Sequence, residues 1–186
     1  MTQTDDTIHA GSAHGSYETV DGRPLLRFER RLAHPIDAVW RAVSDPAELA
    51  HWFPSTIAVE ELRVGGSMTF SFEEHDLPPM QGSVTELDPP RLLGFSWGDD
   101  ELRFELAPSD DGAQTTLRFS VALDARDKAA RDVTGWHVCL DALERQLGGV
   151  RDELPSTGVT PDWRERYEQY VASGMPSGAP IPGTSS

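Results

Sequence analysis

His137 is the residue of this chain whose side chain is the best candidate for proton transfer. It stands in the segment Gly135-Trp136-His137, beside the apolar line through Leu140 of a long helical pattern. A histidine is readily tuned to give or take a proton near neutral pH, so His137 could act as an acid or a base if it reached a cavity. A half-buried histidine with a satisfied hydrogen bond is the commoner case. No other catalytic residue is predicted.

Metal and nucleotide chemistry find little support in the spacing of the polar residues. His137 and Cys139 are two positions apart on a helix and point in different directions, so they cannot share a metal ion. The acidic segments 73–76 and 99–101 follow alternate expected strands and could meet at one end of a sheet, but their spacing matches no calcium loop, and solvated surface charge is expected there. Nucleophile-elbow, phosphate-loop, dinucleotide and His-Glu-x-x-His motifs are all absent from the sequence. We therefore predict no metal and no cofactor.

Aromatic and sulfur-containing side chains could line a small apolar cavity. Such side chains, with a few polar groups among them, suit a small hydrophobic or aromatic ligand. The alternative is that they pack against one another and simply form the core. The candidate lining residues, besides His137, are Met68, Phe70, Met80, Phe95, Trp97, Leu102, Phe104, Phe119, Trp136 and Leu140.

The charge of the chain argues against polyanionic partners. Of 186 residues, 31 are Asp or Glu and 16 are Lys or Arg, which leaves a net charge of −15. The phosphates of a nucleic acid or an anionic membrane would repel such a surface. Cys139 is the only cysteine, so no internal disulfide forms, and no apolar run is long enough for a signal peptide or a membrane helix. We expect a cytoplasmic protein that does not insert into membranes or bind nucleic acid; a protein partner, and a monomer or a homodimer, stay open.

Periodicity predicts a run of strands framed by helices. Two-residue alternation indicates strands at 25–32, 57–64, 67–72, 81–87, 92–97, 102–106 and 117–123. Residues 17–20 are expected to start a strand, with Asp21-Gly22 as the tight turn between them and 25–32. Short helices are expected after Pro35 and from Ala47 to Phe53, with Asp45 as the cap of the second. The longest helix is expected at 127–147, because its apolar residues recur every three or four positions.

These elements predict an α+β fold of the helix-grip kind. A curved antiparallel sheet would carry two short helices after its first strand, and the long C-terminal helix would lie across the sheet because only that element is large enough to cover the apolar face. Residues 1–15 and 174–186 are expected to be disordered tails, 16–150 the domain, and 151–173 an appendage with a short helix.

Four ordered blocks resemble the family of proteins similar to the activator of the heat-shock protein ninety ATPase, within the START-like, Bet v allergen-like (SRPBCC) superfamily. The likeness runs from about residue 17 to 149. The blocks are 28–30 (FER) with 34–53 (HPIDAVWRAVSDPAELAHWF); 64–67 (VGGS); 82–84 (GSV) with 88–91 (DPPR) and 95–97 (FSW); and 135–137 (GWH) with 140–143 (LDAL).

The resemblance implies the helix-grip fold but no single activity. Members of the superfamily include ligand carriers, aromatic cyclases, dehydratases and co-chaperone domains, and a shared fold does not choose among them. We favour a domain without strong catalysis that holds a small hydrophobic or aromatic ligand between the sheet and the last helix. The alternatives are an enzyme of the cyclase, dehydratase or hydrolase kind that uses His137, and a partner that stimulates a chaperone ATPase.

Overall fold

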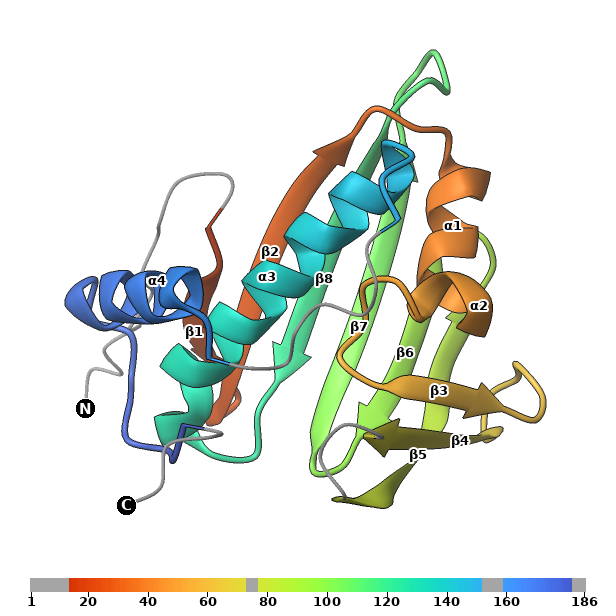
Figure 1. Cartoon of the computed structure of the whole chain (residues 1–186). Coiled ribbons are helices and arrows are strands. Elements are labelled where there is room, and N and C mark those ends of the chain that lie inside the picture. The colour runs from red at the N-terminus through yellow and green to blue at the C-terminus, as the bar shows by residue number, and fades with distance from the viewer. Residues whose placement is uncertain (1–13, 73–76, 152–158, 182–186) are drawn as a thin grey trace.

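A long helix lies across the concave face of one curved antiparallel sheet (Figure 1). The computed structural model describes residues 14–72, 77–151 and 159–181, and within them the sheet has eight strands in the order β1-β2-β8-β7-β6-β5-β4-β3. The strands are β1 (Ser16–Val20), β2 (Arg23–Leu32), β3 (Thr56–Val59), β4 (Ser67–Phe72), β5 (Leu77–Asp88), β6 (Leu92–Trp97), β7 (Asp100–Pro108) and β8 (Thr115–Ala122). The helices are α1 (Ile36–Ser44), α2 (Pro46–Leu49), the 3₁₀ turn η2 (Arg126–Lys128), α3 (Ala129–Leu147) and α4 (Pro161–Ala172).

The predicted helix-grip architecture is confirmed, with α3 within two residues of the expected start. The two short helices follow the second strand rather than the first, which corrects the prediction. The reason is that Asp21 and Gly22 both adopt positive φ, at 51° and 80°, and form the two-residue turn that separates β1 from β2. Asp45 caps α2 as expected, since its carboxylate accepts the N–H of Ala47 at 2.9 Å.

Two strands differ from the predicted bounds by four residues or more at one end. The expected strand 57–64 ends at Val59, and the chain continues as a loop to Gly66. β5 begins four residues before Gln81 and includes Pro78 and Pro79. Prolines are tolerated there because this part of β5 has no β6 neighbour and its pairing with β4 is interrupted by a register shift.

The core is an aromatic layer between α3 and the sheet. Trp136 of α3 meets Phe119 of β8 edge-to-face, with ring centroids 5.1 Å apart. Phe119 in turn stacks on Phe104 of β7 at 4.5 Å, and such a pair adds about 0.5–1.5 kcal/mol beyond its buried area. Val133, Leu140 and Leu143 of the apolar stripe of α3 are fully buried. Packing of this stripe holds α3 in place.

Helix α4 packs against one side of α3 and is joined there by segments that were expected to be tails (Figure 1). Gly15 is buried and donates its N–H to the Tyr170 hydroxyl at 2.8 Å. Met175 is only 3% exposed, and the Pro176 carbonyl accepts the N–H of Ala130 at 2.8 Å. The expectation of disorder is therefore wrong for 174–181, because this extended segment satisfies a donor at the start of α3. Residues 1–13 and 182–186 lie outside the described part.

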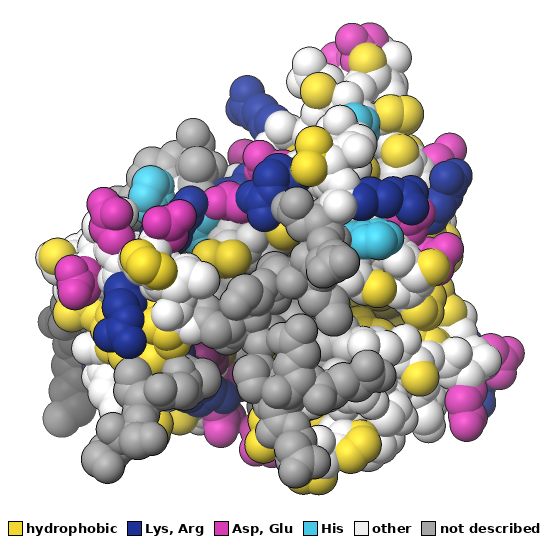
Figure 2. Space-filling model, in the orientation of Figure 1, with side chains coloured by type: hydrophobic (Ala, Val, Ile, Leu, Met, Phe, Trp, Pro, Cys, Tyr) yellow, Lys and Arg dark blue, Asp and Glu magenta, His cyan; other side chains and the backbone are white. Residues whose placement is uncertain are grey.

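The face that carries α3 and α4 mixes charges of both signs. In Figure 2 its acidic and basic side chains are interspersed, and the coloured residues form no extended basic patch. No helix in the described part of the chain is long and apolar enough to cross a membrane.

Gly82 marks the bend where β5 changes from pairing with β4 to pairing with β6. A Cβ at this position would lie 2.2 Å from the carbonyl oxygen of Ser96 and 2.7 Å from the ring of Phe70. We expect Gly82→Ala to lower the free energy of unfolding by about 1–3 kcal/mol through overpacking, measured by urea denaturation. Gly135→Ala is the control, because a Cβ there meets nothing within 4 Å, and it should be at least as stable as the parent chain. An unchanged Gly82→Ala variant would contradict this account.

Candidate functional site

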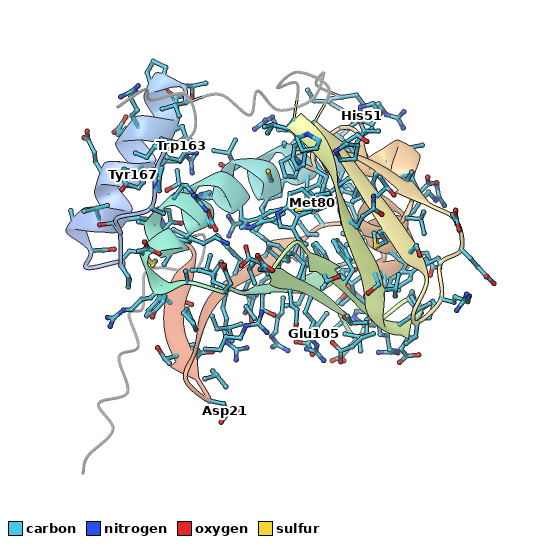
Figure 3. All side chains as sticks on the ribbon, turned by 90° about the horizontal axis from the view of Figure 1, so that it is seen from below. Asp21, His51, Met80, Glu105, Trp163 and Tyr167 are labelled. Atoms are coloured by element: carbon cyan, nitrogen blue, oxygen red, sulfur yellow. The ribbon has the colours of Figure 1, made fainter. Side chains whose placement is uncertain are left out.

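A cavity of about 480 Å³ lies beside α3, between the outer strands of the sheet and the start of α4. In the view of Figure 3, Met80 of β5 and Trp163 of α4 lie on either side of α3, and both line this cavity. Glu105 lies on the face of the sheet that points away from α3. The volume falls in the range of pockets for small organic ligands. The apolar part of its wall is formed by Pro54, Phe72, Met80, Trp97, Trp136, Val138, Cys139, Val159 and Trp163.

Tryptophans dominate the apolar wall. Trp97 meets Trp136 at a centroid distance of 6.1 Å and an interplanar angle of 70°, and it meets Phe72 at 5.7 Å. On the opposite side, Trp163 stacks almost parallel on Tyr167 at 5.3 Å. These contacts hold the rings in place, so a planar ligand would meet a preformed wall.

Gly135 leaves part of the cavity open. It lies in the middle of α3, where glycine costs about 1 kcal/mol relative to alanine. It lines the cavity, and a Cβ built on it meets no atom within 4 Å. A larger side chain at this position would therefore enter the cavity without displacing the protein.

The polar end of the cavity is a set of ion pairs at the start of α3. Lys128 Nζ lies 2.8 Å from Asp100 Oδ2 and 2.6 Å from Asp124 Oδ1. Burial acts to lower the pKa of the Lys128 ammonium, but its hydrogen bonds to Asp100 and Asp124 outweigh burial and raise this pKa above its ordinary value. Arg131 Nε lies 2.6 Å from Asp132 Oδ1. Both basic side chains at this end of the cavity thus form ion pairs with neighbouring carboxylates.

Comparison with known proteins identifies the family. The family description "Activator of Hsp90 ATPase homolog 1-like protein" matches residues 33–148, more than half of the chain. The chain belongs to this family. No curated protein matches the sequence.

Solved structures similar to this member of the activator of Hsp90 ATPase homolog 1-like family share its fold. EF2215 of Enterococcus faecalis, a conserved protein of unknown function, aligns with a TM-score of 0.69 at 22% identity over 85% of this chain and 88% of that one. CalU16 of Micromonospora echinospora, solved in solution, aligns with a TM-score of 0.65 at 23% identity over 94% and 98% of the two chains. DynU16, from the dynemicin biosynthetic locus, aligns at 0.59 and 24% identity over 70% and 50%. At these identities the likeness establishes the fold alone.

In this family member the candidate lining residues divide into two groups. Met80, Trp97 and Trp136 line the cavity. The rest, apart from His137, are buried behind it, where their rings interlock; Phe95, for example, stacks on both Phe70 and Phe104 at about 6 Å. These residues form part of the core, in agreement with the alternative interpretation of the sequence. They are Met68, Phe70, Phe95, Leu102, Phe104, Phe119 and Leu140.

His137 does not line the cavity, which corrects the prediction that it could act there. Successive residues of a helix are about 100° apart, so Gly135 and His137 lie on opposite sides of Trp136. His137 is 4% exposed, and its Nδ1 lies 2.7 Å from the Tyr170 hydroxyl of α4. Since that hydroxyl oxygen already accepts the N–H of Gly15, its own hydrogen is available to donate to Nδ1 of a neutral imidazole.

Burial and positive neighbours keep the His137 imidazole neutral. Burial is the main cause, and together with the charges of Arg166 and Arg30 it lowers the pKa of His137 from 6.5 to about 3. Asp141 Oδ1 lies 3.6 Å from Nε2, but Arg166 also pairs with Asp141, at 2.8 Å. His137 therefore joins α3 to α4 and is unsuited to proton transfer near neutral pH.

Sequence reasoning missed Gly135, Lys128 and Trp163 as lining residues. A glycine inside an otherwise apolar helical pattern was the available signal for Gly135. Asp100, expected to be solvated, is 6% exposed and paired with Lys128. The other acidic segment, 73–76, lies outside the described residues, and among those described no group of three or more His, Cys, Asp or Glu could hold a metal ion.

The neutral state of His137 predicts a pH-dependent stability. Its folded pKa of about 3 lies below its ordinary value of 6.5, so between these values the unfolded chain binds the proton more readily. The contribution to stability should be complete above about pH 6.5 and should fall by about 3 kcal/mol by pH 4. His137→Gln, which keeps an acceptor for Tyr170 but does not titrate, should lack this part of the slope. Urea unfolding at pH 7, 6, 5 and 4 measures both chains, and identical slopes would contradict the assignment.

Proposed function

We propose that this protein binds a small hydrophobic or aromatic molecule in the cavity beside α3 and carries, senses or presents it without strong catalysis. The observation that carries this proposal is the space beside Gly135, which is walled by Trp97, Trp136 and Trp163. A well-packed core would fill such a volume, because interiors are packed like organic crystals. Apolar pockets of this size with a few polar groups at one end suit small ligands.

The position of Gly135 gives the proposal a functional rationale. Alanine in its place would strengthen the helix and meet no steric obstacle. Glycine at this position thus makes the helix less stable but leaves the space beside it open. The likeness to DynU16, which is placed in a biosynthetic locus, is compatible with a small-molecule ligand.

The two alternatives have less support. An enzyme that uses His137 requires this residue to face the cavity, whereas its imidazole contacts α4. A role in stimulating a chaperone ATPase is suggested by the family description alone, and an ATPase assay with the purified chain tests it directly.

Filling the cavity tests the proposal. N-phenyl-1-naphthylamine, a neutral probe that fluoresces in apolar surroundings, should bind the parent chain, and Gly135→Leu should weaken its binding at least about 10-fold. The melting temperature of this variant should be unchanged or higher, since leucine is a better helix former than glycine. Gln169→Leu, on an exposed position of α4, controls for an added leucine and should bind the probe as the parent does. Equal binding by parent and Gly135→Leu would overturn the proposal.

A further inference from the structure

We infer that the cavity selects aromatic ligands with a cationic or neutral polar group, of the class of aromatic amines, and rejects aromatic carboxylates and other anions. This inference rests on the proposed function, because it concerns the same cavity. It follows from the charges and hydrogen bonds at its polar end.

The ionisable residues that line the cavity carry a net negative charge. They are three carboxylates, Asp99, Asp100 and Asp132, and two bases, Lys128 and Arg131. Three negative and two positive charges leave −1 at the cavity. The whole chain carries −15, so the long-range field also draws cations toward the protein and repels anions.

Lys128 has no donor left for an anionic ligand. Its ammonium group has three hydrogens. Nζ lies 3.0 and 2.8 Å from the two oxygens of Asp100 and 2.6 Å from Asp124. A ligand carboxylate would have to displace one of these carboxylates and would leave it unpaired, which costs more than the new bond supplies.

Arg131 has two of its five N–H donors engaged by the protein. Its Nε donates to Asp132 at 2.6 Å, and its Nη1 donates to the carbonyl of Pro180 at 3.2 Å. The fork that would bind a carboxylate through two parallel bonds is therefore engaged on one edge by Asp132.

Two N–H groups at the start of α3 are already bonded to carbonyls of the chain. Free N–H groups at a helix N-terminus ordinarily attract a negative group. Here the N–H of Ala129 bonds to the carbonyl of Arg126, and that of Ala130 bonds to the carbonyl of Pro176. The chain's own carbonyls thus occupy two of the donors that a ligand anion would need.

A cationic group, by contrast, finds suitable partners. Asp99 lines the cavity and is exposed, and in the described part of the chain no side chain pairs with its carboxylate. The faces of Trp97, Trp136 and Trp163 add attraction for a cation that lies over them. An aromatic ring in the apolar part and an ammonium group at Asp99 would satisfy both ends of the cavity.

Three probes on one ring skeleton test the selectivity: 2-naphthylmethylamine, 2-naphthol and 2-naphthoate, which are cationic, neutral and anionic at pH 7. Quenching of tryptophan fluorescence at low salt measures their affinities. We expect the amine to bind at least about 10-fold more tightly than the naphthoate, with the naphthol between them. Added salt should narrow the difference.

A matched pair of variants locates the effect. Asp99→Asn should weaken the amine several-fold and leave the naphthol unchanged. Asp110→Asn, in the exposed turn at the other end of β7, removes the same charge and should change neither affinity.

The outcomes separate the two proposals. Naphthoate binding as tightly as the amine, or equal effects of the two variants, would overturn the charge selectivity, while naphthol binding that is lost in Gly135→Leu would still support the proposed function. Failure of all three probes to bind the parent chain would overturn both.

Discussion

Burial of one stripe of α3 against the concave sheet is the constraint on which the other features depend. Trp136, wedged between Phe119 and Phe53 at centroid distances of 5.1 and 5.4 Å, sets the rotation of the helix about its own axis. Once this rotation is set, the flank with Gly135 must face the outer strands and the flank with His137 must face α4. Open space and a closed polar network thus lie on opposite sides of a single helix.

The two flanks use charge in different ways. Beside α4, Arg30 and Arg166 both approach Asp141, at 3.7 and 2.8 Å, and this cluster tethers α4 to the body of the domain. At the cavity, Lys128 is surrounded by carboxylates, so its charge stabilises the start of α3 and is not offered to a ligand. A basic residue in a pocket therefore indicates an anion site only when its hydrogens are free.

Periodicity predicts the elements well, because strands and helices bury one side and solvate the other. It therefore located the apolar stripe from Val133 to Leu147, and the need to cover the apolar face of the sheet predicted the helix-grip arrangement, which the family resemblance also implied. Neither periodicity nor the resemblance distinguishes residues that line the cavity from residues of the core. Phe95 and Trp97 share a face of β6, yet of these two only Trp97 lines the cavity. The difference depends on how rings from several strands pack together. Trp163 was beyond reach because its position depends on contacts such as His137 to Tyr170, which are distant in sequence.

The attachment of residue 15 to α4 and of residues 176 and 179 to the segment that begins α3 has a mechanical consequence. Gly15 is tied to Tyr170, and residues 176 and 179 are tied to the segment that begins α3. Tension applied to the chain beyond residue 181 would reach these few hydrogen bonds before it reached the strand ladders. Such tension would therefore act on α4, which carries Trp163 of the cavity wall, before it acted on the sheet.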